Sequence, residues 1–325
     1  MASEVEALLE QAQARLDALE VEAALEMCVR ACSLEPTNAA ALAMLGDVSL
    51  QAGDMERARA ALQRSVELMP EGGGARFMTL GQLSEGADAL ELFERGLAAL
   101  RAERAEAEGR SGERSELQRQ WLAATHALAS GLCAAAEVYL TDACDEDGAE
   151  ERCEALATEA VGLVSSLEEH AGLAEPYVTL ASVRLSQQRP ADAEPLLLSA
   201  LDVFARSAEA AAGSQSGAGA GPNAGVDLRA SVAKMLMEVG RAAEAHELML
   251  ALRLEDDESL ELAYLCGCAA VQAEEFESAT TDLKAAIAFA KSERCPEDER
   301  EWLPELEGLL AEAKAAAAAA PAAAA

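Results

Sequence analysis

Aromatic residues are scarce in this chain of 325 residues. Phe, Trp and Tyr together account for 3% of it, whereas hydrophobic residues account for 51%, and alanine is abundant throughout. Sheets draw on aromatic and β-branched side chains, whereas helices can pack closely through small ones. The composition therefore favours helices packed through small side chains and argues against a protein built from sheets.

Basic residues are also few. Lys and Arg number 25 and Asp and Glu number 59, which gives a formal net charge of −34. A chain this acidic is repelled by nucleic acid and by anionic lipid, and it attracts basic partners at a raised encounter rate. Acidity that only keeps the protein soluble is the alternative interpretation. The clear helical periodicity leads us to favour a basic ligand.

Long apolar runs and targeting signals are missing as well. No run of about 18 apolar residues, the length needed for a membrane span, occurs outside the C-terminal alanine tract. Met1–Glu10 has no basic segment, no apolar segment and no arginine, so it matches neither a secretory signal nor a transit peptide. We expect no membrane contact.

Patterns that carry metal or catalytic chemistry are absent from the sequence. None of the eight cysteines forms a Cys-x-x-Cys pair, and the three histidines stand far apart, so zinc-ligand spacing is missing. Cys28, Cys153 and Cys266 fall on apolar positions, where a thiol acts as a small hydrophobe. No Ser/His/Asp or Cys/His arrangement is supported by its spacing. We expect reduced packing cysteines, packing histidines, no metal or cofactor, and no enzymatic activity.

The sequence does contain a repeated helical hairpin, clearest over Ala39–Pro70. A turn at Gly53 and Asp54 separates two helices, and Pro70 ends the second one. Pro36 precedes Pro70 by 34 residues, one repeat length. Large and small residues recur at helical spacing, at Leu42, Leu45, Gly46 and Ser49 in the first helix and at Ala58, Leu62 and Ser65 in the second. This is the tetratricopeptide repeat (TPR) pattern.

The repeat recurs along the chain and predicts an all-α fold, a TPR-type helical-hairpin solenoid of about seven units. We expect units 1–3 over residues 1–100, units 4–5 over 116–206, units 6–7 over 227–291, a C-terminal capping helix over 292–314 and a flexible alanine tail over 315–325. A charged run at 101–115 predicts an extended or frayed insertion. A Gly/Ala/Ser-rich stretch at 207–226 predicts a flexible loop.

The first helix of a TPR hairpin lines the concave wall of the solenoid. Counting along the first helices places apolar, hydroxyl and acidic side chains on this wall, among them Met44, Asp47, Glu175, Ser182, Met237, Glu238 and Tyr264. This mixture suits an extended basic peptide. It does not suit the carboxylate clamp of TPR co-chaperones, which needs Lys, Arg and Asn. For each residue, simple solvation is the alternative.

Four stretches carry features that the general TPR pattern does not predict. They are Phe77–Leu97, Ala134–Leu156, Glu175–Leu197 and Leu228–Gly267. The most specific parts are the early-turning LGQLSEG hairpin, an E-x-Y-x-T-D-x-C segment and an L-x-x-E-D-D-E junction. In order and spacing they resemble the dedicated assembly chaperones of ribosomal protein L-four, the fourth universal protein of the large subunit. The resemblance spans roughly Val5–Ala290.

The resemblance implies a non-enzymatic escort. Such a protein binds the basic internal loop of newly made L-four, keeps it soluble in the cytoplasm, and accompanies it to the nucleus for installation in the pre-60S particle. We expect a monomer that makes no direct contact with nucleic acid. A general TPR scaffold for a co-chaperone or organelle complex is the alternative function.

Two motifs of the resemblance imply contacts with the partner. They supply Glu137, Tyr139, Thr141 and Asp142 from the first motif, and Glu255, Asp256, Asp257 and Glu258 from the second. Packing between helices is the alternative role for Tyr139. Capping of the following helix is the alternative for the acidic junction, since Asp256 or Asp257 would cap well.

Overall fold

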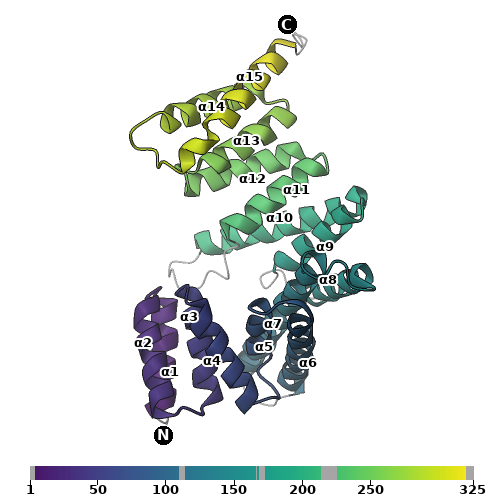
Figure 1. The fold of residues 1–325 in the computed structure, drawn as a ribbon. Coiled ribbons are helices and arrows are strands. Elements are labelled where there is room, and N and C mark those ends of the chain that lie inside the picture. The colour runs from purple at the N-terminus through teal and green to yellow at the C-terminus, as the bar shows by residue number, and fades with distance from the viewer. Residues whose placement is uncertain (1–3, 110–113, 166, 168–172, 214–224, 320–325) are drawn as a thin grey trace. The chain divides into compact units, whose positions relative to one another are not determined.

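The computed structural model describes residues 4–109, 114–165, 167, 173–213 and 225–319. These residues form helices and turns, and no strand occurs among them. The chain divides into two compact units, Met1–Leu167 and Glu168–Ala325 (Figure 1). The all-α prediction is confirmed.

The first unit consists of helical hairpins whose paired helices lie side by side (Figure 1). Its hairpins are α1 (Glu4–Asp17) with α2 (Val21–Leu34), α3 (Ala39–Gln51) with α4 (Met55–Leu68), α5 (Gly74–Gln82) with α6 (Gly86–Gly109), and α7 (Arg114–Leu140) with α8 (Ala149–Ser165). The short α5 and the early start of α6 are as the LGQLSEG segment predicts.

The second unit continues the same design and ends in a single helix. Its hairpins are α9 (Glu175–Ser186) with α10 (Pro190–Gly213), α11 (Val226–Glu238) with α12 (Ala242–Glu255), and α13 (Leu260–Gln272) with α14 (Phe276–Ala290), followed by the 3-10 turn η1 (Glu299–Trp302) and α15 (Leu303–Ala319). The described part of the chain thus holds the seven predicted hairpins.

The hairpins begin and turn where local chemistry favours it. The Asn38 side chain accepts a hydrogen bond from the Ala41 N–H at 3.0 Å, which caps α3. Asp54 accepts one from the Arg57 N–H at 3.0 Å and caps α4. These bonds satisfy N–H groups that have no partner within the helix. Gly53, with φ of +78°, supplies the left-handed residue of the turn between them.

The repeat positions form the core of each hairpin. Leu62 and Ser65 on α4 are fully buried, and the Ser65 hydroxyl donates to the Ala39 carbonyl of α3 at 2.7 Å. Gly46 on α3 leaves room for Leu62. The thiols of Cys28, Cys153 and Cys266 are buried, as their repeat positions predict. Small residues at the crossing points let the two helices approach closely.

First helices of neighbouring hairpins contact each other within each unit. In the first unit α1 touches α3 and α5 touches α7; in the second, α11 touches both α9 and α13. We call the exposed side of these helices the first-helix surface of a unit. The first helices are therefore adjacent, as in a TPR stack.

The charged run after Leu100 is helical, so the prediction of an extended or frayed insertion was wrong for residues 101–109. α6 continues to Gly109 because its arginines find partners on later helices. Arg101 forms two hydrogen bonds to the Glu159 carboxylate on α8, at 2.9 and 2.6 Å. The Arg104 guanidinium donates to the Thr125 hydroxyl on α7 at 3.1 Å and lies over the Trp121 ring. Residues 110–113 lie outside the described part.

Two further boundaries differ from the prediction. α10 extends to Gly213 and α15 extends to Ala319, so the first part of the predicted loop and of the predicted tail is helical. Both extensions are rich in alanine, the residue with the highest helix propensity. Residues 214–224 and 320–325, which hold the rest of that loop and tail, lie outside the described residues.

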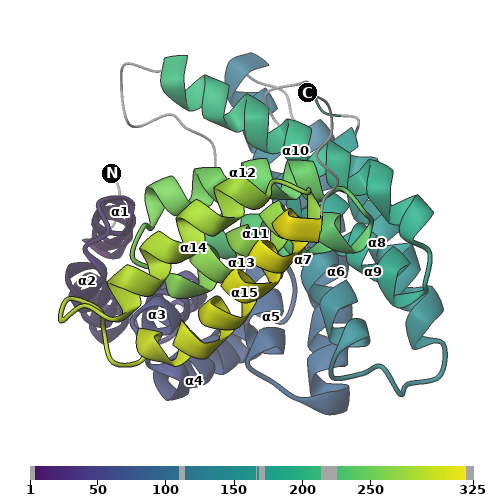
Figure 2. The ribbon, with the colours of Figure 1, turned by 90° about the horizontal axis from the view of Figure 1, so that it is seen from above.

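The last helix covers the final hairpin. Leu306, Leu309 and Ala313 of α15 are buried in a cluster with residues of α13 and α14. Figure 2 shows α15 lying beside both helices. The predicted capping helix is confirmed, although it runs past residue 314. None of the described helices is long and apolar enough to cross a bilayer.

Candidate partner-binding surfaces

Asp47 is the acidic residue predicted on the first-helix surface of the first unit. It lies half-buried on α3, and this burial raises the pKa of its carboxyl group, whereas the nearby Thr79 side chain on α5 acts in the opposite direction. Its neighbour Met44 packs partly against a buried cluster that includes Cys28. Asp47 is therefore a costly charge that the fold holds between two first helices.

The first-helix surface of the second unit mixes open charges with apolar groups. Glu238 is exposed at the end of α11, while Glu175 and Ser182 on α9 are half-buried. Met237 packs partly against the main apolar cluster of the unit. The Lys234 ammonium on α11 lies 3.3 Å from the Glu261 carboxylate on α13, which shows that these two first helices present their side chains side by side.

Tyr264 lies half-buried on α13, next to the capping segment. Its ring centroid is 5.6 Å from that of Trp302 on η1, at an interplanar angle of 36°. This pairing adds an aromatic contact to the C-terminal cap. Tyr264 thus has a structural role, in addition to its predicted place on the first-helix surface.

The first family motif is split between the interior and the surface. Tyr139 on α7 is only 7% exposed. Its hydroxyl accepts a hydrogen bond from Arg152 on α8 at 3.3 Å, and the Arg152 guanidinium lies 5.9 Å from its ring centroid. Glu137, Thr141 and Asp142 are exposed around it. The Tyr139 side chain therefore packs between helices, whereas its three motif neighbours remain accessible.

In the second family motif, three of the four acidic residues form hydrogen bonds or ion pairs within the protein. The Arg229 guanidinium forms a two-pronged pair with Glu255, both contacts at 2.6 Å, and this pair lowers the pKa of the Glu255 carboxyl group. The Asp256 carboxylate accepts from the Ser259 N–H at 3.1 Å. Glu258 pairs with Arg294 at 3.2 Å. Asp257 is exposed.

The start of α13 is held by side chains of Ser259, Asp256 and Glu299, the last of which accepts from the Leu260 N–H at 2.8 Å. Ser259 is the N-cap of α13, and its hydroxyl accepts from the Leu262 N–H at 3.3 Å. Asp256 orients Ser259 by accepting from its N–H group. The alternative that Asp256 or Asp257 is the N-cap of α13 was therefore wrong, because Ser259 holds that position.

Grooves also occur between the second helices of neighbouring hairpins. One of about 460 Å³ lies between α6 and α8, with Tyr139 in its lining and the Arg101–Glu159 pair at its edge. Another of about 560 Å³ lies between α10 and α12 and is lined by Phe204 and the Arg229–Glu255 pair. The repeat pattern of the first helices does not predict these grooves.

Comparisons with known proteins show which family the chain belongs to. A family model described as tetratricopeptide repeat matches residues 16–72. A protein of Schizosaccharomyces pombe named "Probable assembly chaperone of rpl4" is 30% identical over 259 residues, which cover 76% of this chain and 68% of that protein. The chain belongs to the family of rpl4 assembly chaperones.

Two more matches extend this family assignment. A relative of the same name from Emericella nidulans is 31% identical over 319 residues, or 91% of this chain and 73% of that protein. The solved structure of residues 1–338 of the assembly chaperone of RpL4, Acl4, superposes with a TM-score of 0.69 at 30% identity and covers 86% of this chain and all of the other. The resemblance to the L-four assembly chaperones that the sequence predicts is confirmed.

Proposed function

We propose that this protein is a non-enzymatic escort of the ribosomal protein rpl4, the L-four protein of the sequence resemblance. It holds the basic internal loop of newly made rpl4, keeps that loop soluble, and delivers the protein to pre-60S particles. The supporting observation is family membership of a chain that carries a net charge of −34. An unassembled basic loop otherwise binds RNA through its charges.

The acidic field of the chaperone supplies fast capture of the loop. Oppositely charged partners associate at rates well above those of neutral ones, and this gain falls as salt screens the charges. The exposed acids of the first-helix surfaces, such as Glu238, give the loop several weak contacts. Several weak contacts allow release when the ribosome precursor binds the loop more tightly.

The escort works in both the cytoplasm and the nucleus in this proposal. It acts as a monomer with no direct hold on nucleic acid, because its charge opposes that of RNA. A general TPR scaffold for another complex is the competing function. It would bind a non-basic partner and leave the rpl4 loop unbound.

A titration of the purified full chain with an rpl4 loop peptide tests the proposal. We expect one peptide per chain, with affinity that falls as salt rises. A scrambled peptide of the same charge separates specific binding from charge attraction alone. Equal binding of both peptides would contradict a dedicated escort, and no binding of either would favour the scaffold.

A matched pair of charge reversals locates the binding surface. Glu238 ends the first helix α11 and Glu209 lies near the end of the second helix α10, and both are exposed. A lysine at either place is compatible with the negative end of the helix dipole, so both variants should fold. We expect Glu238→Lys to weaken loop binding several-fold more than Glu209→Lys does. The reverse order would move the site to the second helices.

A further inference from the structure

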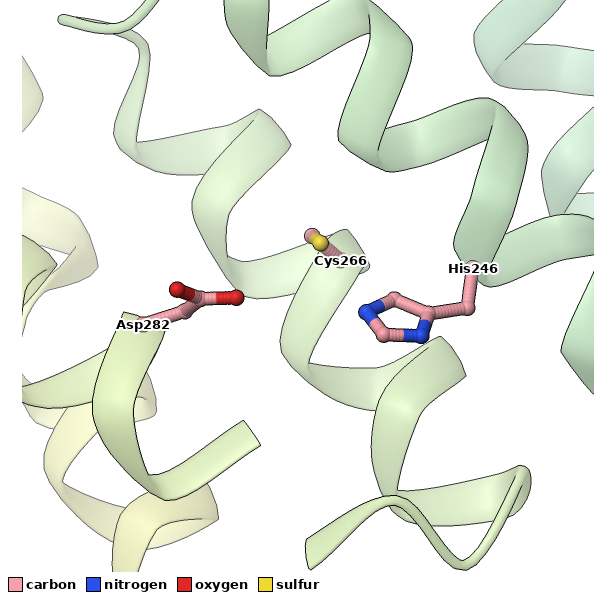
Figure 3. A group of neighbouring side chains, drawn as sticks. All are labelled: His246, Cys266 and Asp282. Atoms are coloured by element: carbon pink, nitrogen blue, oxygen red, sulfur yellow. The ribbon is translucent and has the colours of Figure 1, made fainter. Parts of the chain in front are cut away.

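Three side chains from successive helices of the second unit meet in its interior. They are His246 on α12, Cys266 on α13 and Asp282 on α14, and their nitrogen, sulfur and oxygen ligand atoms all lie within 4.8 Å of one another (Figure 3). His246 is 2% exposed and Cys266 is fully buried, whereas Asp282 is half-buried. Burial of polar groups among apolar helices costs free energy unless they bind one another or a ligand.

His246 is held in the orientation that a metal ligand requires. Its Nδ1 lies 3.1 Å from the Glu275 carboxylate, so the Nδ1–H donates there and Nε2 is the nitrogen that could bind a metal ion. Nε2 is buried and has no hydrogen-bond partner among the described residues. Figure 3 shows the ring directed toward Cys266 and Asp282. A buried polar atom left without a partner is costly, so this nitrogen requires an explanation.

A carboxylate that orients a histidine whose other nitrogen is free is the standard support of a metal-binding imidazole. Nitrogen, thiolate and carboxylate donors together suit Zn²⁺. Bonds of about 2.0–2.3 Å place the ligand atoms of a tetrahedral ion about 3.3–3.8 Å apart, so small rotations of these side chains are enough to close the site.

We propose that His246, Cys266 and Asp282 bind one Zn²⁺ ion, with water in the fourth position, and that the ion ties the sixth hairpin to the seventh. The thiolate and the carboxylate balance the charge of the ion. Because the ligands come from three different helices, their spacing matches no sequence motif, and the sequence alone therefore predicts no metal.

The thiol must lose its proton when the ion binds. Burial and the Asp282 charge raise the pKa of Cys266 to about 11, while Arg253 acts in the opposite direction. The metal-free protein therefore carries a neutral thiol at neutral pH, and Zn²⁺ displaces that proton, which passes to solvent, as the Zn–S bond forms. No oxidant or reductant takes part.

Cobalt substitution of the full chain tests the site directly. After treatment with a chelator, one equivalent of Co²⁺ should give the visible bands of a tetrahedral ion and a thiolate-to-cobalt charge-transfer band, and Zn²⁺ should abolish both. Cys266→Ser should remove the charge-transfer band. Cys268→Ser is the matched control, because Cys268 lies on the same helix but outside the cluster, and it should leave the band unchanged.

A second variant guards against loss of the fold in Cys266→Ser. Asp282 is half-buried, so Asp282→Asn should fold, bind Co²⁺ at least tenfold more weakly, and lose the rise in melting temperature that Zn²⁺ gives the unaltered chain. Absence of a thiolate band in the unaltered protein would overturn the proposal. So would equal bands in the unaltered protein and Cys266→Ser. Neither readout involves rpl4, so this test is independent of the proposed function.

Discussion

A Cβ atom added at Gly46 would lie 2.5 Å from Cγ of Leu62, which is closer than packed atoms can approach. The two helices of the second hairpin therefore meet at a point that only glycine allows. Overpacking of this kind costs about 1–3 kcal/mol. We expect Gly46→Ala to lower the stability of the protein by about that amount in urea unfolding.

Gly162 provides the control for this substitution. It lies inside α8, and a Cβ atom there would meet nothing within 4 Å. Since alanine favours a helix over glycine by up to about 1 kcal/mol, Gly162→Ala should stabilise the protein slightly. A loss of stability at position 162 as large as at position 46 would show that steric conflict with Leu62 is not the cause.

Asp47→Asn should stabilise the protein and weaken its binding of the rpl4 loop. Burial raises the pKa of the Asp47 carboxyl group in the folded state. A raised carboxyl pKa means that the folded state disfavours the charged form. The free energy of unfolding of the unaltered protein therefore falls as the pH rises from the unfolded pKa through the folded pKa of Asp47. The stability gain of the variant should therefore appear at neutral pH and fade in acid. Thermal melts at several pH values, paired with loop titrations, measure both effects.

Glu255→Gln should destabilise the protein at neutral pH but not in acid. The Arg229 pair lowers the pKa of the Glu255 carboxyl group, so its contribution is present above the unfolded pKa and disappears as pH falls through the folded pKa. Half-exposed ion pairs contribute about 1 kcal/mol or less to stability. The Arg229 side chain, however, is only 12% exposed, so the variant removes the Glu255 carboxylate from a largely buried charge and the destabilisation should be measurable.

Glu258→Gln is the control for this charge pair. Glu258 also contacts an arginine, but its partner Arg294 is 79% exposed and is free to meet water instead. We expect no measurable change in stability from this variant. Chemical unfolding at neutral and acidic pH compares the two, and equal losses would argue against the role given to burial of Arg229.

Tyr139 should act through packing. Tyr139→Phe removes only the hydrogen bond from Arg152 and should cost about 1 kcal/mol or less. Tyr139→Ala opens a cavity between α7 and α8 and should cost about 3–5 kcal/mol. Should Tyr139→Phe instead keep full stability but lose most of its affinity for the loop, its hydroxyl would be a partner contact.

The hairpins were predictable because their signals are local. Leu62, Gly46 and Ser65 sit at fixed helical spacing, and Pro36 and Pro70 mark the repeat length, so register and topology follow from sequence distance alone. The continuation of α6 depends on Arg101 meeting Glu159, two residues that are 58 positions apart. No local pattern reports such a pairing, so the sequence predicts an extended or frayed insertion where the structure has a helix.

The candidate surfaces were predictable to a smaller extent. Residues at first-helix positions, such as Glu238, are open as the repeat requires. The buried state of Tyr139 and the pairing of Glu255 depend on Arg152 and Arg229, which lie on other helices. The His246 cluster is hidden in the same way, because its three ligands are brought together only by the stacking of α12, α13 and α14.

The helices of each unit contact mainly the helices that neighbour them in the sequence. Folding of such an array needs few long loops to close, so it is expected to be fast, to nucleate at any hairpin and to propagate to its neighbours. Chain synthesis runs from the N-terminus, and the first hairpins can form while later ones are still being translated. Each hairpin completed in this way adds its own acidic side chains, so the nascent chain already has part of its negative field before its last helix is made.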